Sequence, residues 1–89
     1  MIEKTIAIQN QLGLHARASM KLINAASRFQ SQITITYLNE TVDAKDIMQV
    51  MALTAPNQAL ITVRTEGEDE EAAMAAILAL VSNKFDEDE

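Results

Sequence analysis

The chain has 89 residues, 48% of them apolar, and this length allows one small domain with a single core. It has no cysteine and one histidine, which excludes disulfides, thiolate metal sites and a multi-histidine zinc site, so we expect no metal and no cofactor. The net charge of −6, without a basic stripe or an aromatic platform, argues against nucleic-acid binding. No apolar run of about 18 residues and no signal-peptide pattern is present, so we expect a cytoplasmic protein without membrane insertion.

The charge is divided unevenly along the chain. Residues 1–65 carry six basic and four acidic side chains, whereas residues 66–89 carry one basic and nine acidic side chains. The first part is therefore net positive and can steer the protein toward acidic partner surfaces, while we expect the last part to hold the negative charge elsewhere.

The first half of the chain alternates between strand and helix patterns. Ile6 and Ile8 alternate with polar neighbours, which predicts a strand followed by a polar loop in which Gly13 is free to adopt a positive φ. Small and apolar residues then recur every three or four positions, so we expect an amphipathic helix over about 16–28. Alternating isoleucine and threonine predict a second strand over 33–37.

The second half continues the same alternation. A tight turn leads into a short strand near 40–42, and the polar segment 43–46 supplies N-cap candidates for a short helix that carries Ile47, Val50, Met51 and Leu53. The nearly continuous apolar content of 60–65 predicts a strand in the middle of the sheet. A final helix opens with the acids of 68–71 and extends to Phe85.

This order, β-α-β-β-α-β-α, predicts an α+β fold with one sheet and helices on one face. We expect residues 1–85 to form a single domain and residues 86–89 to form a solvated acidic tail. The predicted core consists of Ile6, Ile8, Leu22, Ala26, Phe29, Ile33, Ile35, Met51, Leu60, Ile61, Val63, Ile77, Leu78 and Val81.

The one candidate chemical site is the segment 13–19, where the only histidine stands between a glycine-containing loop and the start of a helix. The first amides of a helix lack partners and carry partial positive charge, which favours anions. Arg17 adds a planar cation suited to phosphate oxygens, and the neutral imidazole of His15 is a competent nucleophile. The alternative is that His15 is an N-cap or a surface residue without chemistry.

Two motifs resemble the signatures of a known family. Residues 13–17, Gly-Leu-His-Ala-Arg followed by a helix, are similar to the active-site signature of the HPr family, the histidine phosphocarriers of the phosphotransferase system. Residues 45–53, Lys-Asp-Ile-Met-Gln-Val-Met-Ala-Leu, resemble the family's second signature, a short helix. The resemblance covers the whole chain and implies an open-faced sandwich, with an antiparallel four-stranded sheet covered on one side by three helices.

The resemblance also implies a function. His15 would accept a phosphoryl group on Nδ1 from phosphorylated enzyme I, itself charged by phosphoenolpyruvate, and pass it to an enzyme IIA. Arg17 and the backbone amides around Ala16 and Arg17 would hold the phosphoryl oxygens. The implied docking surface consists of Met20, Lys21, Asn24, Ile47, Met48 and Met51. Of the two methionines in the second motif, Met51 fits core packing better and Met48 fits an exposed contact.

Three departures from the family pattern have separate consequences. Ala18 replaces a proline that usually sets the helix start, which removes no chemistry. Asp46 replaces the serine that a regulatory kinase phosphorylates in many relatives, so we expect this control to be absent; Asp46 is either a partial mimic of phosphoserine or simply a helix cap. Gln49, the pair 57–58 and the acidic C-terminal end lean toward the nitrogen-related branch of the family (NPr), whereas the second motif is closer to the sugar-related branch.

The predicted function is thus that of a carrier in a relay, with monomer as the expected state, rather than a stand-alone enzyme. Two rivals remain open at this point. One is a regulatory HPr-like module that binds partners without relay activity, and the other is a generic α+β interaction module in which His15 is incidental.

Overall fold

The computed structural model describes residues 1–87, and Asp88 and Glu89 of the predicted acidic tail lie outside the described residues. The chain folds in the predicted order of elements. These are β1 (Ile2–Ala7), α1 (Ala16–Ala26), β2 (Gln32–Tyr37), β3 (Glu40–Asp43), α2 (Ile47–Ala52), β4 (Leu60–Glu66), α3 (Glu70–Ser82) and the short 3₁₀ turn η1 (Lys84–Asp86). No helix within residues 1–87 is both long and apolar enough to cross a bilayer.

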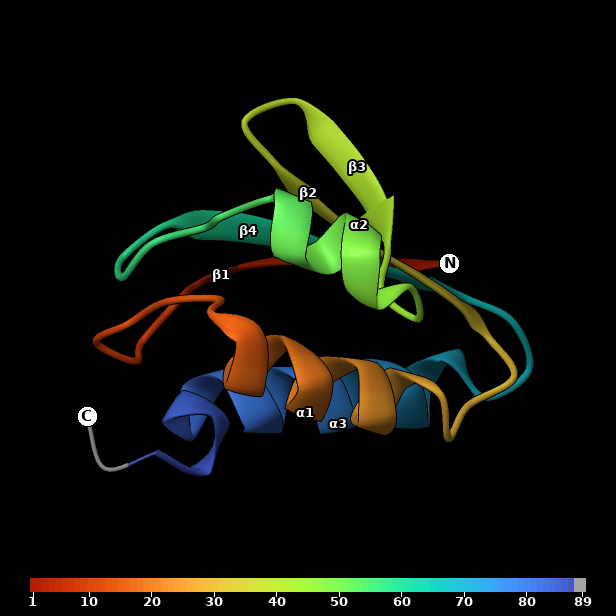
Figure 1. Ribbon diagram of the computed structural model, residues 1–89. Coiled ribbons are helices and arrows are strands. Elements are labelled where there is room, and N and C mark those ends of the chain that lie inside the picture. Colours follow the sequence, from red (N-terminus) through yellow and green to blue (C-terminus); the bar gives the residue numbers. More distant parts are fainter. Residues whose placement is uncertain (88–89) are drawn as a thin grey trace.

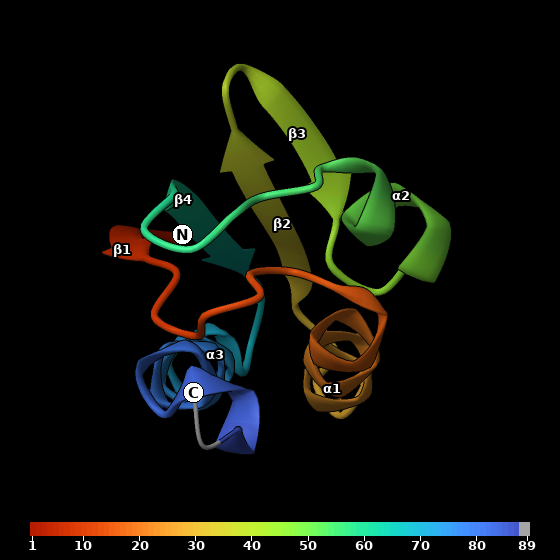
Figure 2. The same ribbon diagram turned by 60° about the vertical axis from the view of Figure 1, so that its left-hand side comes forward.

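The strands form one antiparallel sheet in the order β1-β4-β2-β3, so β4 is an interior strand, as predicted. The helices lie against one face of this sheet, with α1 and α3 side by side and α2 next to β3 (Figures 1 and 2). The uncovered face carries polar pairs such as Thr5 with Thr62 and Thr36 with Thr41, whose hydroxyls are hydrogen-bonded. The predicted open-faced sandwich is confirmed.

The core lies between the sheet and the helices and is built from aliphatic side chains, as expected. Among the predicted core residues, Leu60 and Met51 are exposed, which contradicts the prediction. Leu60 faces the open side of the sheet, because Ile61, Val63 and Thr65 take the buried alternate positions of β4. Three other predicted core residues, Ile6, Phe29 and Leu78, are only partly buried.

The C-terminal end of the structure differs most from the prediction. The helix α3 ends at Ser82 rather than continuing to Phe85. Lys84, Phe85 and Asp86 all have positive φ, of 57°, 54° and 61°, so the chain turns back on itself. This turn inserts Phe85, which is fully buried, into the core from outside the helix. The prediction of a solvated tail is therefore wrong for Glu87, which the turn carries back to the start of α1.

Candidate active site

The loop before α1 is shaped by Gly13, which has a φ of +69°. A Cβ atom at this position would lie 2.4 Å from the carbonyl oxygen of Ala55, so only glycine fits without displacing the backbone. The loop is tied to the chain after α2 by the N–H of Leu14, which donates to the Ala55 carbonyl at 2.8 Å. The position of His15 is therefore set by packing between two loops that are distant in the sequence.

His15 is the N-cap of α1. Its backbone is extended, with φ −76° and ψ −178°, and its Nδ1 accepts a long hydrogen bond of 3.3 Å from the N–H of Arg17. Its carbonyl accepts the N–H of Ser19 at 2.9 Å, which starts the helix. The lone pair of Nδ1 thus faces the amides of the first turn, where an anion bound to Nδ1 would meet the positive end of the helix.

The other imidazole nitrogen meets a carboxylate. His15 Nε2 lies 2.6 Å from Oε2 of Glu87, and the two side chains are only 27% and 15% exposed. Oε1 of the same carboxylate accepts the side-chain amide of Asn10 at 3.0 Å. Burial by itself raises the pKa of Glu87, but the hydrogen bonds from Asn10 and His15, with the nearby charge of Lys21, bring it below its ordinary value. Glu87 is therefore ionised at neutral pH.

Arg17 and Ala16 occupy the first turn of α1 and are both exposed. Within residues 1–87, no carboxylate lies within ion-pair distance of the Arg17 guanidinium. Position 18 carries alanine instead of the family's proline, yet the helix still begins at Ala16, and Ala18 is fully buried. Backbone amides and a guanidinium thus lie at the same helix end as the Nδ1 of His15.

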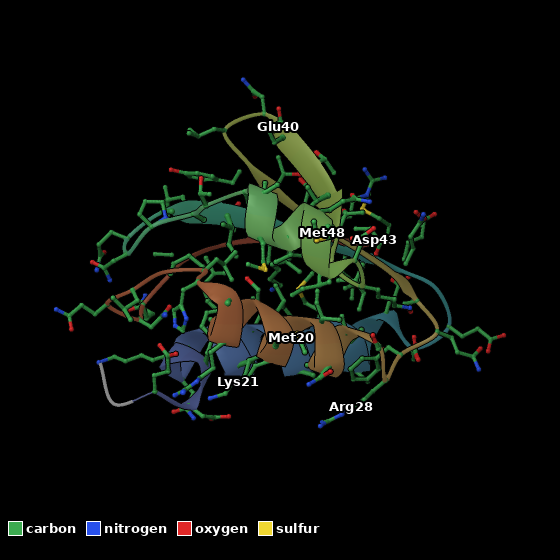
Figure 3. The ribbon with its side chains drawn as sticks, in the orientation of Figure 1. Met20, Lys21, Arg28, Glu40, Asp43 and Met48 are labelled. Carbon is green, nitrogen blue, oxygen red and sulfur yellow. The ribbon has the colours of Figure 1, made fainter. Side chains whose placement is uncertain are left out.

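The residues of the predicted docking surface lie on α1 and α2, which contact each other. Met20 is half exposed and Met48 is 76% exposed, one on each helix (Figure 3). Met51, expected in the core, instead lines a surface hollow of about 370 Å³ together with His15 and the exposed Leu12, which the sequence analysis did not single out.

The remaining members of the docking surface have more varied environments. Asn24 is exposed on α1, and Ile47 is half-buried at the start of α2. Lys21 is partly buried, and its Nζ donates to the carbonyl of Phe85 at 2.6 Å, so it also holds the C-terminal turn (Figure 3). Three of the six predicted surface residues therefore lie on α1 and three on the neighbouring α2, and Lys21 has a second, structural contact.

Asp46 caps α2. Its Oδ1 accepts the N–H groups of Met48 and Gln49 at 3.0 and 3.2 Å, and its Oδ2 accepts the side-chain amide of Gln49 at 3.1 Å. Gln49, one of the departures from the family pattern, thus belongs to this cap. The helix-capping interpretation of Asp46 is confirmed.

The sequence analysis missed Glu87 and Asn10 as neighbours of His15. Glu87 is 72 positions away in the sequence, and its approach depends on three non-glycine residues with positive φ, for which the local sequence carries no signal. Asn10 was included only as part of a polar loop, although its side chain is fully buried and donates to the Gly13 carbonyl at 2.7 Å.

The comparisons with known proteins agree with this geometry. The family description "PTS HPr component phosphorylation site" matches residues 2–83. The phosphocarrier protein HPr of Xylella fastidiosa (strain Temecula1) is 47% identical over 88 residues, which are 99% of both chains. Among solved structures, HPr-C-His from Thermoanaerobacter tengcongensis matches all of both chains, with a TM-score of 0.96 and 40% identity. An HPr dimer from the same organism matches 98% of this chain and all of that one, with a TM-score of 0.79 and 41% identity. Fold, motifs and full-length similarity lead to one conclusion: the chain belongs to the HPr family, the phosphocarrier proteins of the phosphotransferase system.

Proposed function

We propose that His15 accepts a phosphoryl group on Nδ1 from phosphorylated enzyme I, which phosphoenolpyruvate charges, and passes it to a histidine of an enzyme IIA. The observation that carries this proposal is the orientation of the imidazole, whose Nδ1 lies at the amides of the first turn of α1. These amides and the guanidinium of Arg17 would hold the phosphoryl oxygens, because partial and full positive charges at a helix start favour a dianion.

The transfer needs little from the protein beyond positioning. The Nδ1 lone pair forms the new P–N bond while the bond between phosphorus and the donor nitrogen breaks and its electron pair returns to the donor. Positive charge then rests on the His15 ring, and the phosphoryl charge rests against Ala16 and Arg17. The reverse sequence of events hands the group to the acceptor, which suits a carrier in a relay rather than a stand-alone enzyme.

The experiment that tests the proposal is incubation with phosphoenolpyruvate and purified enzyme I, followed by intact-mass measurement before and after acid treatment. We expect one acid-labile phosphoryl group on the wild-type chain and none on His15→Ala, which removes the only histidine. Ser27→Ala, at the exposed C-cap of the same helix and outside the predicted docking surface, is the matched control for helix integrity. If the wild type is not labelled, the relay fails, and the alternative of a regulatory HPr-like binding module without relay activity takes its place.

The branch of the family is decided by the same assay with two donors, an enzyme I of the sugar-related type and one of the nitrogen-related type. Gln49, the pair 57–58 and the acidic C-terminal segment, which depart from the sugar-related pattern, favour the nitrogen-related branch, NPr. We therefore expect faster labelling by the nitrogen-type donor. Faster labelling by the sugar-type donor assigns the chain to sugar uptake instead.

Partner enzymes would dock on the exposed side of α1 and α2. Met20, Met48 and Met51 provide flexible apolar contacts around His15, which suit a surface that binds both a donor and an acceptor. One small face that serves two partners in turn also supports a monomer in the cytoplasm as the working state. Sedimentation velocity at the assay concentration tests the monomer, and the dimeric relative makes this measurement necessary.

Asp46 bears on regulation. A carboxylate cannot take the phosphoryl group that a serine kinase transfers, so we propose that this chain escapes such control. The test offers an ATP-dependent HPr kinase the wild type and Asp46→Ser, which keeps a capping side chain. Labelling of Asp46→Ser alone supports the proposal, and equal labelling of both contradicts it.

A further inference from the structure

We propose that the exposed methionines of the docking surface, Met20, Met48 and Met51, form a reversible oxidation site through which peroxide weakens the binding of partner enzymes. The effect on docking rests on the function proposed above. The oxidation itself, with the order in which the methionines react, is a property of the isolated chain and is measured without any partner.

Three of the five methionines lie exposed on the docking surface, although methionine is an apolar residue. Met48, Met20 and Met51 are 76%, 50% and 40% exposed. Met48 and Met51 stand three positions apart on α2, so they share one face of this helix. Met20 lies on α1, which contacts α2 (Figure 3). The three thioethers are therefore open to small solutes on two neighbouring helices.

These methionines adjoin the candidate nucleophile. Met20 follows Ala16 by four positions, so it lies one turn further along the face of α1 that carries the residue after His15. Met51 lines the hollow of about 370 Å³ together with His15. A partner enzyme that brings its own histidine to His15 therefore covers these side chains, and a change in their polarity changes the free energy of docking.

The other two methionines provide comparisons within the same chain. Met74 is 3% exposed and belongs to the core under α3. Met1 is exposed, and its amine contacts Glu70 at the start of α3, the end opposite the start of α1 (Figure 1). Oxidation by peroxide follows exposure, so we expect Met1 and the three docking methionines to react while Met74 stays reduced.

The chemistry of the site requires only a peroxide, because the chain has no cysteine to compete for the oxidant. The thioether sulfur attacks one oxygen of hydrogen peroxide, so an S–O bond forms and the O–O bond breaks. The other oxygen leaves as hydroxide and takes the remaining proton to form water. Sulfur is thereby oxidised by two electrons to the sulfoxide. Methionine sulfoxide reductases reverse the step: a dithiol supplies two electrons and becomes a disulfide, and the sulfoxide oxygen leaves as water.

Oxidation converts the docking surface from apolar to polar. A thioether packs against apolar side chains of a partner, whereas a sulfoxide carries an oxygen that needs a hydrogen-bond partner once it is buried. Docking removes water from this oxygen, so the oxidised chain binds its partners more weakly. The reacting groups of His15 and Arg17 are unaltered, and the effect therefore falls on binding and not on the chemical step.

The first test is peptide mass spectrometry after limited treatment of the folded, unphosphorylated chain with hydrogen peroxide. We expect one added oxygen on each docking methionine, fastest at Met48, and none on Met74. Methionine sulfoxide reductases of both epimer specificities, with a dithiol, should remove the added oxygen. Docking methionines that resist peroxide as Met74 does, or sulfoxides that the reductases leave in place, overturn the proposal.

The second test measures the KM of enzyme I for the chain before oxidation, after oxidation and after enzymatic reduction. We expect oxidation to raise KM about tenfold, the effect of losing one well-buried interface contact, with kcat nearly unchanged and full recovery on reduction.

The matched variant combines Met20→Leu, Met48→Leu and Met51→Leu, which keep a similar apolar volume without the sulfur. Each chain is compared with its own untreated sample, so that any effect of the leucines on docking itself cancels. The leucine variant should lose the response to peroxide, although its Met1 is still oxidised.

Several outcomes contradict the proposal. A wild-type KM that does not change on oxidation overturns it, as does a leucine variant that responds as strongly as the wild type. A fall in kcat at constant KM would place the effect on the chemical step instead. If no chain accepts the phosphoryl group, the relay fails, and calorimetry of enzyme I with the unphosphorylated chain replaces KM. Weaker binding after oxidation then supports the proposal, and unchanged or absent binding overturns it.

Discussion

At the scale of single residues, the structure gives His15 the N-cap role, which is compatible with its proposed role as a nucleophile. The extended backbone of an N-cap turns its side chain back over the first turn, where Nδ1 accepts the N–H of Arg17. The same geometry aims the lone pair at the place where an anion is best stabilised. Capping the helix and presenting a nucleophile are therefore the same arrangement, and the cap interpretation does not count against the chemistry.

Arg17 carries the first prediction. Arg17→Ala should slow phosphoryl acceptance about tenfold to a hundredfold, because a hydrogen bond to a charged group is worth about 1.5–3 kcal/mol. Arg17→Lys should recover part of the rate, since it keeps the charge but loses the planar fork. Single-turnover labelling with phosphorylated enzyme I measures both.

The matched control for Arg17 is Arg28→Ala, which removes a cation from the exposed face near the other end of the same helix. It should affect the rate far less than Arg17→Ala at moderate salt. Equal losses for the two variants would mean that Arg17 acts only through the overall charge of the surface and does not hold the phosphoryl group.

The residue that the sequence could not reveal is Glu87. The segments 13–17 and 45–53 can be identified from their local sequence, because they contain a glycine, a helix-capping residue and a periodic apolar pattern. Glu87 reaches His15 only because Phe85 is buried and the turn before it is left-handed. None of the three residues with positive φ is a glycine or an asparagine, although Asn83 directly precedes them and donates to Asp86 across the turn. The apolar spacing alone therefore favours a helix that continues to Phe85.

At the scale of elements, the wrong core predictions have a common cause. The run Leu60-Ile61 in β4 suggested burial on both faces, yet one face of the sheet is open, and strict alternation places Leu60 outward. In α2, Val50 and Leu53 are buried and Met51 turns toward the hollow beside His15. Periodicity identifies a strand or a short helix, but the face that is covered depends on where the other elements pack.

The second prediction concerns Asp69, at the start of α3, and its hydrogen bonds to residues 30–31, which follow α1. Asp69 accepts a hydrogen bond from the Ser31 hydroxyl and the N–H groups of Gln30 and Ser31, which lower its pKa below its ordinary value of 3.8. The stabilisation is therefore present above that value and is lost as the pH falls through the lower pKa of the folded chain. Asp69→Ala should reduce the free energy of unfolding at neutral pH, and the gap to the wild type should narrow as the pH falls below 3.8 and through the lower pKa of the folded chain.

Urea unfolding at a series of pH values measures this gap. Glu71→Ala, which removes an exposed carboxylate of the same helix, serves as the control and should leave the free energy of unfolding nearly unchanged. A gap for Asp69→Ala that stays constant from neutral to strongly acidic pH would show that the variant acts through lost packing and not through the ionised carboxylate.

At the scale of the whole molecule, the charges are separated, but less simply than the sequence suggested. Glu66, Glu68, Glu70 and Glu71 surround the start of α3, next to the N-terminal amine, which pairs with Glu70 at 2.8 Å. This end lies opposite the start of α1 (Figure 1). One acid of the C-terminal segment, Glu87, lies at the site and contacts His15. The expectation that the acidic part holds its charge elsewhere is correct for the α3 acids and wrong for Glu87.

Met20, Lys21 and Arg28 follow one another along α1 (Figure 3), and the exposed Arg17 lies in its first turn. These basic residues on one helix support the steering prediction. Charges at a docking face change the rate of encounter and are screened over about 10 Å at 0.1 M salt. The rate of phosphoryl acceptance should therefore fall as ionic strength rises, and Arg28→Ala should make this dependence shallower. Glu71→Gln, in the first turn of α3 at the end opposite the start of α1 (Figure 1), should change the slope far less, because salt screens distant charges. Measured at several salt concentrations with one donor, equal slopes for all three chains would contradict steering by α1 and leave the helix with a contact role only.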